Sequence, residues 1–468
     1  MTASRRLGPQ DMMFLYAETP TTMMHVAGLL PLTPPPGAAP DYMRRLIADA
    51  RSEQVVAPWN LKLAHPRLPY LPTQSWVVDT EFDLDYHVRR SALASPGDER
   101  ELGILVSRLH GNSVDLTRPP WELHLIEGLE GGRFAAYIKV HHSLVDGYSA
   151  MKFLAQGMST DPDHTDPRLF FNVAAPTKAG TAAPTLNGGP LGAVRGLAKN
   201  LVGAVDSAMS VTRALVNTEV RRDNEYRHLI GSAEAPHSIL NGRIGRNRRF
   251  ATQQYKIARL KELGARHRAT INDVAVAVIG GGLRTFLGEL GELPDRSLVA
   301  LLPVNVRPKD DEGGGNAVGA MLVPIGSDIA DPVRRLAAVN TATRLSKAQL
   351  RTMSRNAILA YSAALLAPGG IQMASALTGI RPPVPYTFNL CISNVAGPRE
   401  TLYFNGSRLE ATYPVSIPIH GMALNITLQS YADTMNFGFV GCRDTLPHLQ
   451  RLAVYTGAAL DELERRPD

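Results

Sequence analysis

A stretch without regular hydrophobic spacing divides this chain of 468 residues into two parts that each mix helix and strand patterns. Residues 161–193 are rich in Pro, Gly, Ala and Thr, which is typical of a linker. Before the linker, Glu99–His110 has helical spacing and Arg133–His141 has the composition of a strand. After it, Thr270–Leu287 predicts a helix and Ala423–Tyr431 predicts a strand. We therefore predict an α/β fold with two domains of similar size, each a mixed sheet with flanking helices.

The linker also sets the expected domain limits. We expect an N-terminal domain over residues 1–160, a linker with a long helix over 161–245, and a C-terminal domain over 246–468. Between Leu191 and Val211 the apolar residues fall near helical spacing, and the charged residues lie off that stripe. We expect this amphipathic helix to pack between the domains, with a membrane surface as the alternative partner.

No segment of the sequence predicts a membrane span. The longest uncharged stretch is Asn356–Ile380, and Pro368, Gly369 and Gly370 interrupt it before either half reaches the ~20 residues that a span needs. We interpret it as two short helices that either belong to the core or touch lipid. Gly8 and the residues after it interrupt any secretion signal, so we expect a cytoplasmic protein.

Composition excludes several classes of protein. Two cysteines, Cys391 and Cys442, are too few for a disulfide scaffold or a cysteine zinc cluster, and we interpret both as packing residues. The formal net charge of +6 is too small to indicate nucleic-acid binding. It is compatible with an anionic lipid or with a substrate that carries phosphates.

Several catalytic motifs are absent from the sequence. The nearest match to the nucleophile elbow G-x-S-x-G is Gly147–Met151, which lacks the second glycine. The phosphate loop, H-E-x-x-H and C-x-x-C do not occur, and the two Gly-Gly-Gly triplets do not fit G-x-G-x-x-G. These absences argue against serine hydrolases, nucleotide phosphate transfer and nicotinamide chemistry.

One motif contains residues that are suited to catalysis. It lies where the strand Arg133–His141 should end and a loop should begin. It reads His141, His142, three further residues, Asp146 and Gly147. Neighbouring residues of an extended chain point to opposite sides, so we expect one imidazole to face a cavity and the other to pack behind it. A neutral imidazole is a good general base near neutral pH. A metal site is disfavoured because the two rings diverge and no third ligand is evident.

H-H-x-x-x-D-G is the signature of the acyltransferases related to chloramphenicol acetyltransferase and to the condensation domains of peptide synthetases. Four further strings, in order along the chain, resemble motifs of one branch: Pro119–Glu122, Thr270–Val274, Pro303–Arg307 and Ser393–Pro398. Three residues depart from those motifs, namely Pro120, Asn305 and Ala396. Over nearly its whole length the chain resembles the bacterial wax ester synthase/acyl-CoA:diacylglycerol acyltransferase family, in its actinobacterial, triacylglycerol-forming type.

The resemblance implies roles for the motif residues. His142 would be the general base that takes the proton from an acceptor hydroxyl, with His141 supporting it, in a tunnel between the two domains. Transfer would be direct, in a complex of both substrates, with no covalent serine or cysteine intermediate. Asp146 would be structural and pair with an arginine, for which Arg307 is the candidate.

Further residues are candidates for binding the substrates. Asn272, Ser393 and Asn394 could stabilise the oxyanion, although an Asn-Asp pair at a helix start also suits capping. Trp121 could line the tunnel or belong to the core. An arginine cluster could hold the phosphates of coenzyme A, or form a solvated turn or an interdomain ion-pair set. Its members are Arg243, Arg246, Arg248 and Arg249.

The resemblance therefore implies an O-acyltransferase that moves a long acyl chain from coenzyme A to diacylglycerol, with fatty alcohols as further acceptors. Acyl-CoA is a co-substrate, and no cofactor, metal or nucleic acid is expected. We expect a cytoplasmic protein that is peripherally associated with a membrane or lipid droplet. The alternatives are a related acyltransferase with a carrier-protein donor or a non-lipid acceptor, and a catalytically silent lipid-binding protein.

Overall fold

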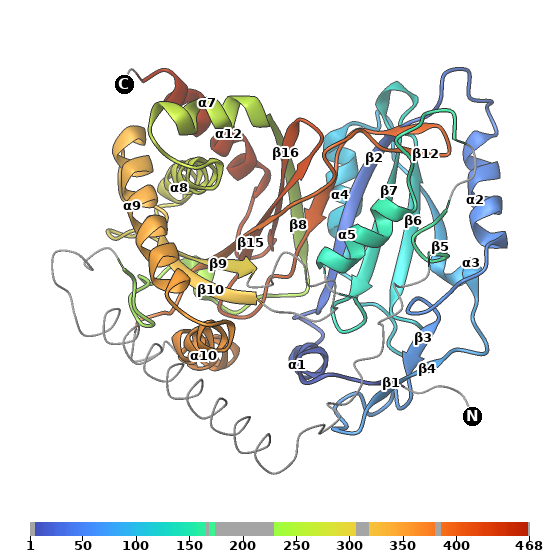
Figure 1. Ribbon diagram of the computed structural model, residues 1–468, viewed down its shortest axis with the longest axis horizontal. Coiled ribbons are helices and arrows are strands. Elements are labelled where there is room, and N and C mark those ends of the chain that lie inside the picture. Colours follow the sequence, from blue (N-terminus) through green and yellow to red (C-terminus); the bar gives the residue numbers. More distant parts are fainter. Residues whose placement is uncertain are drawn as a thin grey trace, which may run out of the picture.

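The computed structural model describes residues 5–145, 147–164, 168–173, 229–305, 318–379 and 385–466. Within these residues, one mixed sheet is built mainly from the N-terminal half and another from the C-terminal half, and the two lie beside each other (Figure 1). Helices cover the outer sides of both sheets, which confirms the predicted α/β fold. The predicted helix between Leu191 and Val211 falls outside the described residues.

The N-terminal sheet has the strand order β12-β13-β2-β7-β6-β5. The N-terminal half of the chain contributes four of these strands, namely β2 (His25–Thr33), β5 (Val88–Ala92), β6 (Trp121–Glu127) and β7 (Phe134–His141). The pair β5–β6 is parallel and the pairs that β7 makes with β2 and β6 are antiparallel. The predicted strand Arg133–His141 is thus confirmed as the central strand β7.

The two faces of this sheet differ in chemistry. Ile138 and Val140 of β7 point to the outer face, into a core shared with α2 (Tyr42–Ser52) and α5 (Gly147–Gln156). Because strand residues alternate, Tyr137, Lys139 and His141 point to the inner face. The inner face packs on α4 (Glu99–His110), which lies between the two halves (Figure 1).

The C-terminal sheet has the order β10-β9-β11-β15-β16-β8. Its strands are β8 (Arg248–Lys256), β9 (Val299–Asn305), β10 (Val318–Pro324), β11 (Leu390–Val395), β15 (Leu424–Tyr431) and β16 (Thr434–Cys442). Its outer face is covered by α7 (Ile257–Arg266), α8 (Ile271–Glu289), α9 (Pro332–Arg351) and α12 (Gln450–Glu464). Its inner face meets α4 through Phe250 and Val440.

Three short strands from the C-terminal half cross over to the N-terminal sheet. They are β12 (Tyr403–Phe404), β13 (Ser407–Leu409) and β14 (Tyr413–Val415), and β13 and β14 pair with β2. The segment passes close to β16, because a Cβ on Gly438 would lie 1.9 Å from the Pro414 carbonyl oxygen. The limits at residues 160 and 246 stay predictions, and this crossover shows that the two halves do not form fully separate sheets.

Smaller elements lie along the lower edge of the molecule in Figure 1. The helix α1 (Pro9–Ala17) lies near a three-stranded sheet of β1 (Arg5–Arg6), β4 (Ser75–Val78) and β3 (Leu61–Leu63). A four-residue helix, α3 (Leu84–His87), precedes β5.

The uncharged stretch near residue 370 forms two helices, as predicted. They are α10 (Arg355–Leu366) and α11 (Gly369–Thr378), separated at Pro368. By length and composition alone, two segments among the described residues could cross a membrane, namely α8 and the pair Arg355–Thr378. However, α8 is 72% buried in the C-terminal core, where its apolar residues pack on the sheet.

Candidate active site

His141 is the last residue of β7 and is fully buried. Its register partner is His25 of β2. The main-chain N–H of Ser143 donates to its Nδ1 at 3.2 Å, so this nitrogen carries no proton. The proton therefore sits on Nε2, which lies 3.4 Å from a carboxylate oxygen of Glu18. Protein groups thus lie beside both ring nitrogens of His141.

His142 lies just beyond the strand in a different environment. It is half-buried, and its main-chain N–H donates to the Met24 carbonyl at 2.9 Å. Its ring stacks on Phe14 of α1, with ring centroids 4.0 Å apart and planes inclined by 20°. His142 is therefore the more accessible imidazole of the pair. It packs against α1, which lies more than 120 residues earlier in the sequence.

The sequence offered no signal for Glu18, which connects the two histidines. Its carboxylate accepts a short hydrogen bond from the Met24 N–H and also faces Nε2 of His141. Because the carbonyl of Met24 holds the backbone of His142, one carboxylate fixes the surroundings of both rings. We assign Glu18 as a positioning residue, because its carboxylate contacts protein groups beside both rings.

Replacing Glu18 by Ala should lower kcat roughly 10- to 100-fold, because the buried Met24 N–H loses its acceptor and the 18–24 turn shifts. KM should change much less. Glu18→Gln, which keeps an acceptor oxygen, should recover most of the activity. Steady-state kinetics of the two variants tests this role, and equal losses in both, or a loss confined to KM, would contradict it.

A buried charge network lies beside His141 on the inner face of the sheet. Nζ of Lys139 is 3.0 Å from the Glu122 carboxylate, which also contacts Arg89 at 3.3 Å and Nε2 of His124 at 3.1 Å. Burial alone would raise the pKa of Glu122, but the hydrogen bond from His124 and the charges of Lys139 and Arg89 hold that pKa at about 2. Burial lowers the pKa of Lys139, and Glu122 opposes that shift.

His110 at the end of α4 joins the two halves. Burial lowers the pKa of His110 to about 3, so its ring is neutral. Nε2 lies 2.9 Å from the Ser416 carbonyl and therefore donates, which leaves Nδ1 to accept from the Tyr137 hydroxyl at 3.0 Å. The neutral tautomer of His110 thus links the inner face of the N-terminal sheet to the crossover segment.

The structure brings together two of the three predicted oxyanion candidates. The side-chain amide of Asn394, on β11, lies 3.5 Å from Oδ1 of Asn272 at the start of α8. The capping role falls to Thr270 and Asp273, which bond to each other's backbone N–H groups. Asn272 is therefore not needed as a cap. Ser393 stands beside Thr427 in the parallel pair β11–β15.

The substrate role predicted for Trp121 does not fit its position. Its side chain is fully buried on the outer face of the sheet, opposite to His141. The indole N–H donates to the Trp59 carbonyl at 2.7 Å, and Phe170 and Phe171 pack on the ring. Trp121 is therefore a core residue, which is the second of the two roles that the sequence allows for it.

The predicted arginine cluster divides into different environments. Arg243 and Arg246 are exposed, whereas the buried Arg248 donates to the carbonyls of Gly245 and Thr21, both at 2.6 Å. Arg248 thus connects the two halves of the chain, and its guanidinium is not presented to a phosphate. Burial, together with the charges of Arg443 and Arg100, lowers the pKa of the half-buried Arg249.

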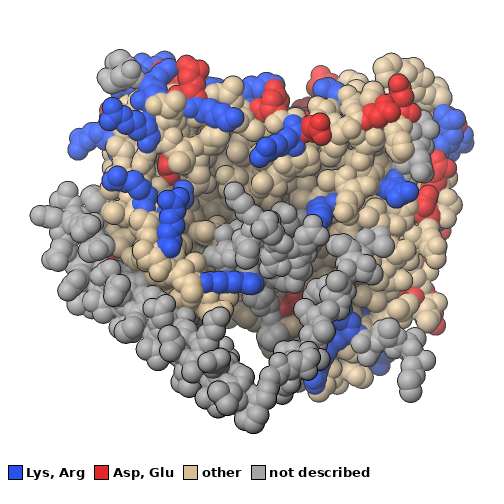
Figure 2. Space-filling view, in the orientation of Figure 1, with Lys and Arg blue, Asp and Glu red and all other residues tan. Residues whose placement is uncertain are grey.

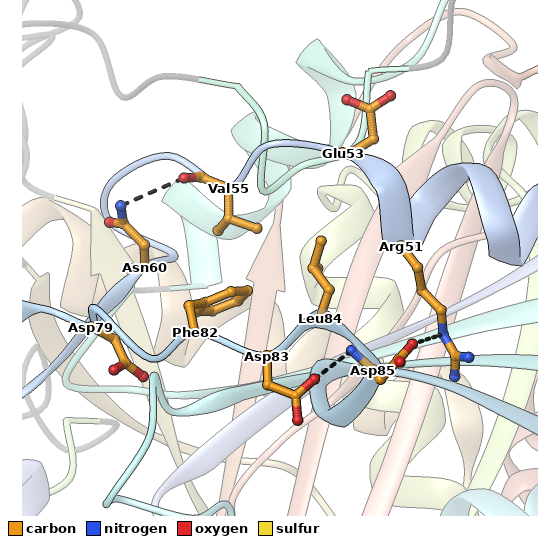
Figure 3. Close-up of a pocket in the computed structure, with 9 residues that line it drawn as sticks. All are labelled: Arg51, Glu53, Val55, Asn60, Asp79, Phe82, Asp83, Leu84 and Asp85. Atoms are coloured by element: carbon orange, nitrogen blue, oxygen red, sulfur yellow. Dashed lines mark hydrogen bonds and ion pairs between the residues drawn. The ribbon is translucent and has the colours of Figure 1, made fainter.

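A cavity of about 540 Å³ lies beside α3, and neither motif histidine is among its lining residues (Figure 3). Its three aspartates have cationic partners, since Asp79 contacts Lys62 at 2.7 Å, Asp83 contacts Arg118 at 3.5 Å and Asp85 contacts Arg51 at 3.1 Å. Among the described residues, no group of His, Cys, Asp and Glu has the arrangement of a metal site. Asp146 and Arg307, the predicted structural pair, lie outside those residues.

Comparison with known proteins places this geometry in a family. Residues 7–275 match the wax ester synthase/diacylglycerol acyltransferase catalytic domain, and residues 314–464 match the C-terminal domain of the same family. The chain belongs to the wax ester synthase/diacylglycerol acyltransferase family. The resemblance predicted from five motifs is thereby confirmed, and the chain is an acyltransferase.

Relatives match over almost the whole length of this family member. A Mycobacterium tuberculosis protein named as a diacylglycerol O-acyltransferase is 63% identical over 482 residues, which cover 98% of this chain and 97% of the relative. Another, named tgs2, is 38% identical over 460 residues, or 98% of each chain.

Solved structures agree on the architecture. The wax ester synthase/diacylglycerol acyltransferase from Marinobacter aquaeolei VT8 has a TM-score of 0.77 at 35% identity, over 98% of each chain. The first condensation domain of the calcium-dependent antibiotic synthetase has a TM-score of 0.52 at 14% identity, over 98% of this chain and 95% of that one. The second likeness shows the fold alone.

Proposed function

We propose that this family member transfers a long-chain acyl group from acyl-CoA to the free hydroxyl of diacylglycerol, which yields triacylglycerol and coenzyme A. The observation that supports this most is the half-buried imidazole of His142 at the end of β7, in a chain 63% identical to a protein named for that activity. Long-chain alcohols are further acceptors, in line with the Marinobacter relative's name.

In the proposed mechanism, His142 accepts the proton of the acceptor hydroxyl. The hydroxyl oxygen attacks the thioester carbonyl, the carbon–sulfur bond breaks, and the departing thiolate of coenzyme A takes the proton back from His142, which restores the free base. His141 is unsuited to be the base, because it is fully buried and its ring nitrogens face Ser143 and Glu18. A positioned base contributes typically 10²–10⁴-fold in rate, and holding both substrates together contributes up to ~7–11 kcal/mol.

Residues of the C-terminal half would complete the site. The adjoining amides of Asn272 and Asn394 are suited to donate hydrogen bonds to the oxyanion that forms on the thioester carbonyl. The exposed Arg243 and Arg246 are suited to the phosphates of coenzyme A, unlike the buried Arg248. Asp146 and Arg307 keep their proposed structural role. The protein would work in the cytoplasm, docked peripherally on the membrane or lipid droplet that supplies its acceptor.

An acceptor panel tests this proposal. Purified protein with radiolabelled oleoyl-CoA should acylate dioleoylglycerol fastest among diacylglycerol, monoacylglycerol, hexadecanol and a sterol, because relatives that are 63% and 38% identical are named for that acceptor. Thin-layer separation of the labelled products gives each rate. Product formed only from an acyl-carrier-protein donor, or lipid binding with no product from any acceptor, would contradict the proposal.

A further inference from the structure

Exposed apolar or aromatic side chains lie on α1 and on the loop and strand beside it, and we call these five residues the α1 patch. Its members are Met13 (67% exposed), Tyr16 (48%), Leu68 (60%), Tyr70 (54%) and Val78 (37%). Met13 and Tyr16 are three residues apart on α1 and so share one face of that helix. The rings of Tyr16 and Tyr70 stack with centroids 6.4 Å apart, which joins the helix to the loop before β4.

The charges around the α1 patch are mostly positive. The segments that build it, residues 5–17 and 64–78, contain Arg5, Arg6 and Arg67, and all three are exposed. Their single acidic residue is Asp11, whose carboxylate accepts from the Gly8 N–H at the start of α1. Tyrosine, methionine and leucine rimmed by arginine suit the boundary of an anionic phospholipid surface.

Surface charge is distributed differently elsewhere on the molecule. Figure 2 shows Lys, Arg, Asp and Glu of both signs most densely along the upper rim of the face in view, with others spread down its sides. The α1 patch belongs to elements at the opposite, lower edge, where α1 lies close to β1, β3 and β4 (Figure 1). An apolar surface with arginines at its rim is unusual for a protein face that meets only water.

The same helix reaches the motif histidine. Phe14 lies between Met13 and Tyr16 in sequence, but its ring turns inward and stacks on His142 at 4.0 Å. The helix therefore has one face in contact with the proposed base and another exposed to the surroundings. A lipid surface that covers the outer face would lie next to the ring of His142, separated from it by a single helix.

We propose that the α1 patch docks the protein on a phospholipid surface with anionic headgroups, and that lipid acceptors pass from this surface to His142 beside α1. The proposal rests on the proposed function in one respect, namely that the acceptor is a lipid. Docking through this patch brings the acceptor pool to the side of the molecule where Phe14 covers His142. The acceptor then avoids a transfer through water, which is costly for a molecule with long apolar chains.

The test compares a patch variant with a matched control on vesicles. The full chain carrying Met13→Ser, Tyr16→Ser and Tyr70→Ser is mixed with vesicles of phosphatidylcholine and phosphatidylglycerol that contain dioleoylglycerol. Sedimentation should show binding at least about tenfold weaker than that of the unmodified protein, because three apolar contacts are lost. The control is Val454→Ser on α12, where an apolar side chain of 60% exposure lies far from α1 (Figure 1).

Activity measurements separate docking from chemistry. With acceptor in vesicles the patch variant should lose rate in proportion to binding, whereas with dibutyrylglycerol dissolved in water it should match the unmodified protein. The control should behave normally in both assays, and vesicles without phosphatidylglycerol should bind the unmodified protein less.

Three results would overturn the docking proposal. They are unchanged vesicle binding by the patch variant, an equal loss with Val454→Ser, and a loss seen instead with Ile371→Ser/Leu377→Ser on α11, another exposed apolar face. Failure of the proposed function looks different. In that case the unmodified protein acylates neither acceptor, while its vesicle binding still depends on the patch.

Discussion

Purified His142→Ala protein should form triacylglycerol with kcat lowered by a factor on the order of 10²–10⁴, which is the contribution typical of a positioned base. The ring of His142 packs on Phe14 at the surface of the core, so its removal should cost little stability. Affinity for acyl-CoA should be nearly unchanged, because the proposed partners of coenzyme A lie on other residues. Product formation from labelled acyl-CoA under saturating acceptor gives kcat directly.

Two further variants make this result specific. His164→Ala removes an exposed imidazole from a loop and should leave kcat unchanged. His141→Ala should mainly lower the melting temperature, because it opens a cavity and leaves Ser143 and Glu18 without their partner. Wild-type turnover by His142→Ala, or an equal loss with His164→Ala, would rule out the base assigned to His142.

Glu122→Ala should destabilise the protein by about 3–5 kcal/mol, since it leaves the buried ammonium of Lys139 without its carboxylate. Lys139 keeps two carbonyl acceptors, Leu109 and Asn112, but these do not neutralise its charge. Urea unfolding at neutral pH measures the loss.

The effect of Glu122→Ala should depend on pH in a defined direction. The folded pKa of Glu122 is about 2, below the ~4.3 of an unfolded glutamate. A carboxyl group with a depressed folded pKa stabilises the protein fully above its unfolded pKa and loses that contribution as pH falls through its folded pKa. The difference between the two proteins should therefore shrink as pH falls from 5 toward 2.

The same strands supply a matched control for the buried network. Arg90 and Glu127 form a bidentate pair between β5 and β6, but Arg90 is half-exposed. Glu127→Ala should therefore cost much less stability than Glu122→Ala, because water can solvate the remaining arginine. Equal losses in the two variants would show that burial does not determine the strength of the network.

Elements with strong periodicity could be predicted from the sequence. The helical spacing of Glu99–His110 became α4, and the strand ending at His141 became β7. The expectation that neighbouring imidazoles diverge rests on strand geometry alone, and the two rings do lie in different environments.

Features that depend on tertiary contacts could not be predicted. The strands β12–β14 have two or three residues each, which is too short for an alternating pattern to appear. Glu18 has no motif, because its role comes from a turn that folds back onto β7. Arg248 looked like its three neighbours in the cluster, since sequence cannot tell a buried guanidinium bound to carbonyls from an exposed one.

The central claim is that the acyl group passes directly from coenzyme A to the lipid hydroxyl with His142 as base. The most direct measurement follows free coenzyme A and protein-bound label after mixing the purified protein with radiolabelled acyl-CoA, with and without diacylglycerol. Direct transfer predicts that coenzyme A appears only with the acceptor, mole for mole with triacylglycerol, and that the protein stays unlabelled. A burst of coenzyme A without acceptor, matched by acyl label on the protein, would contradict it.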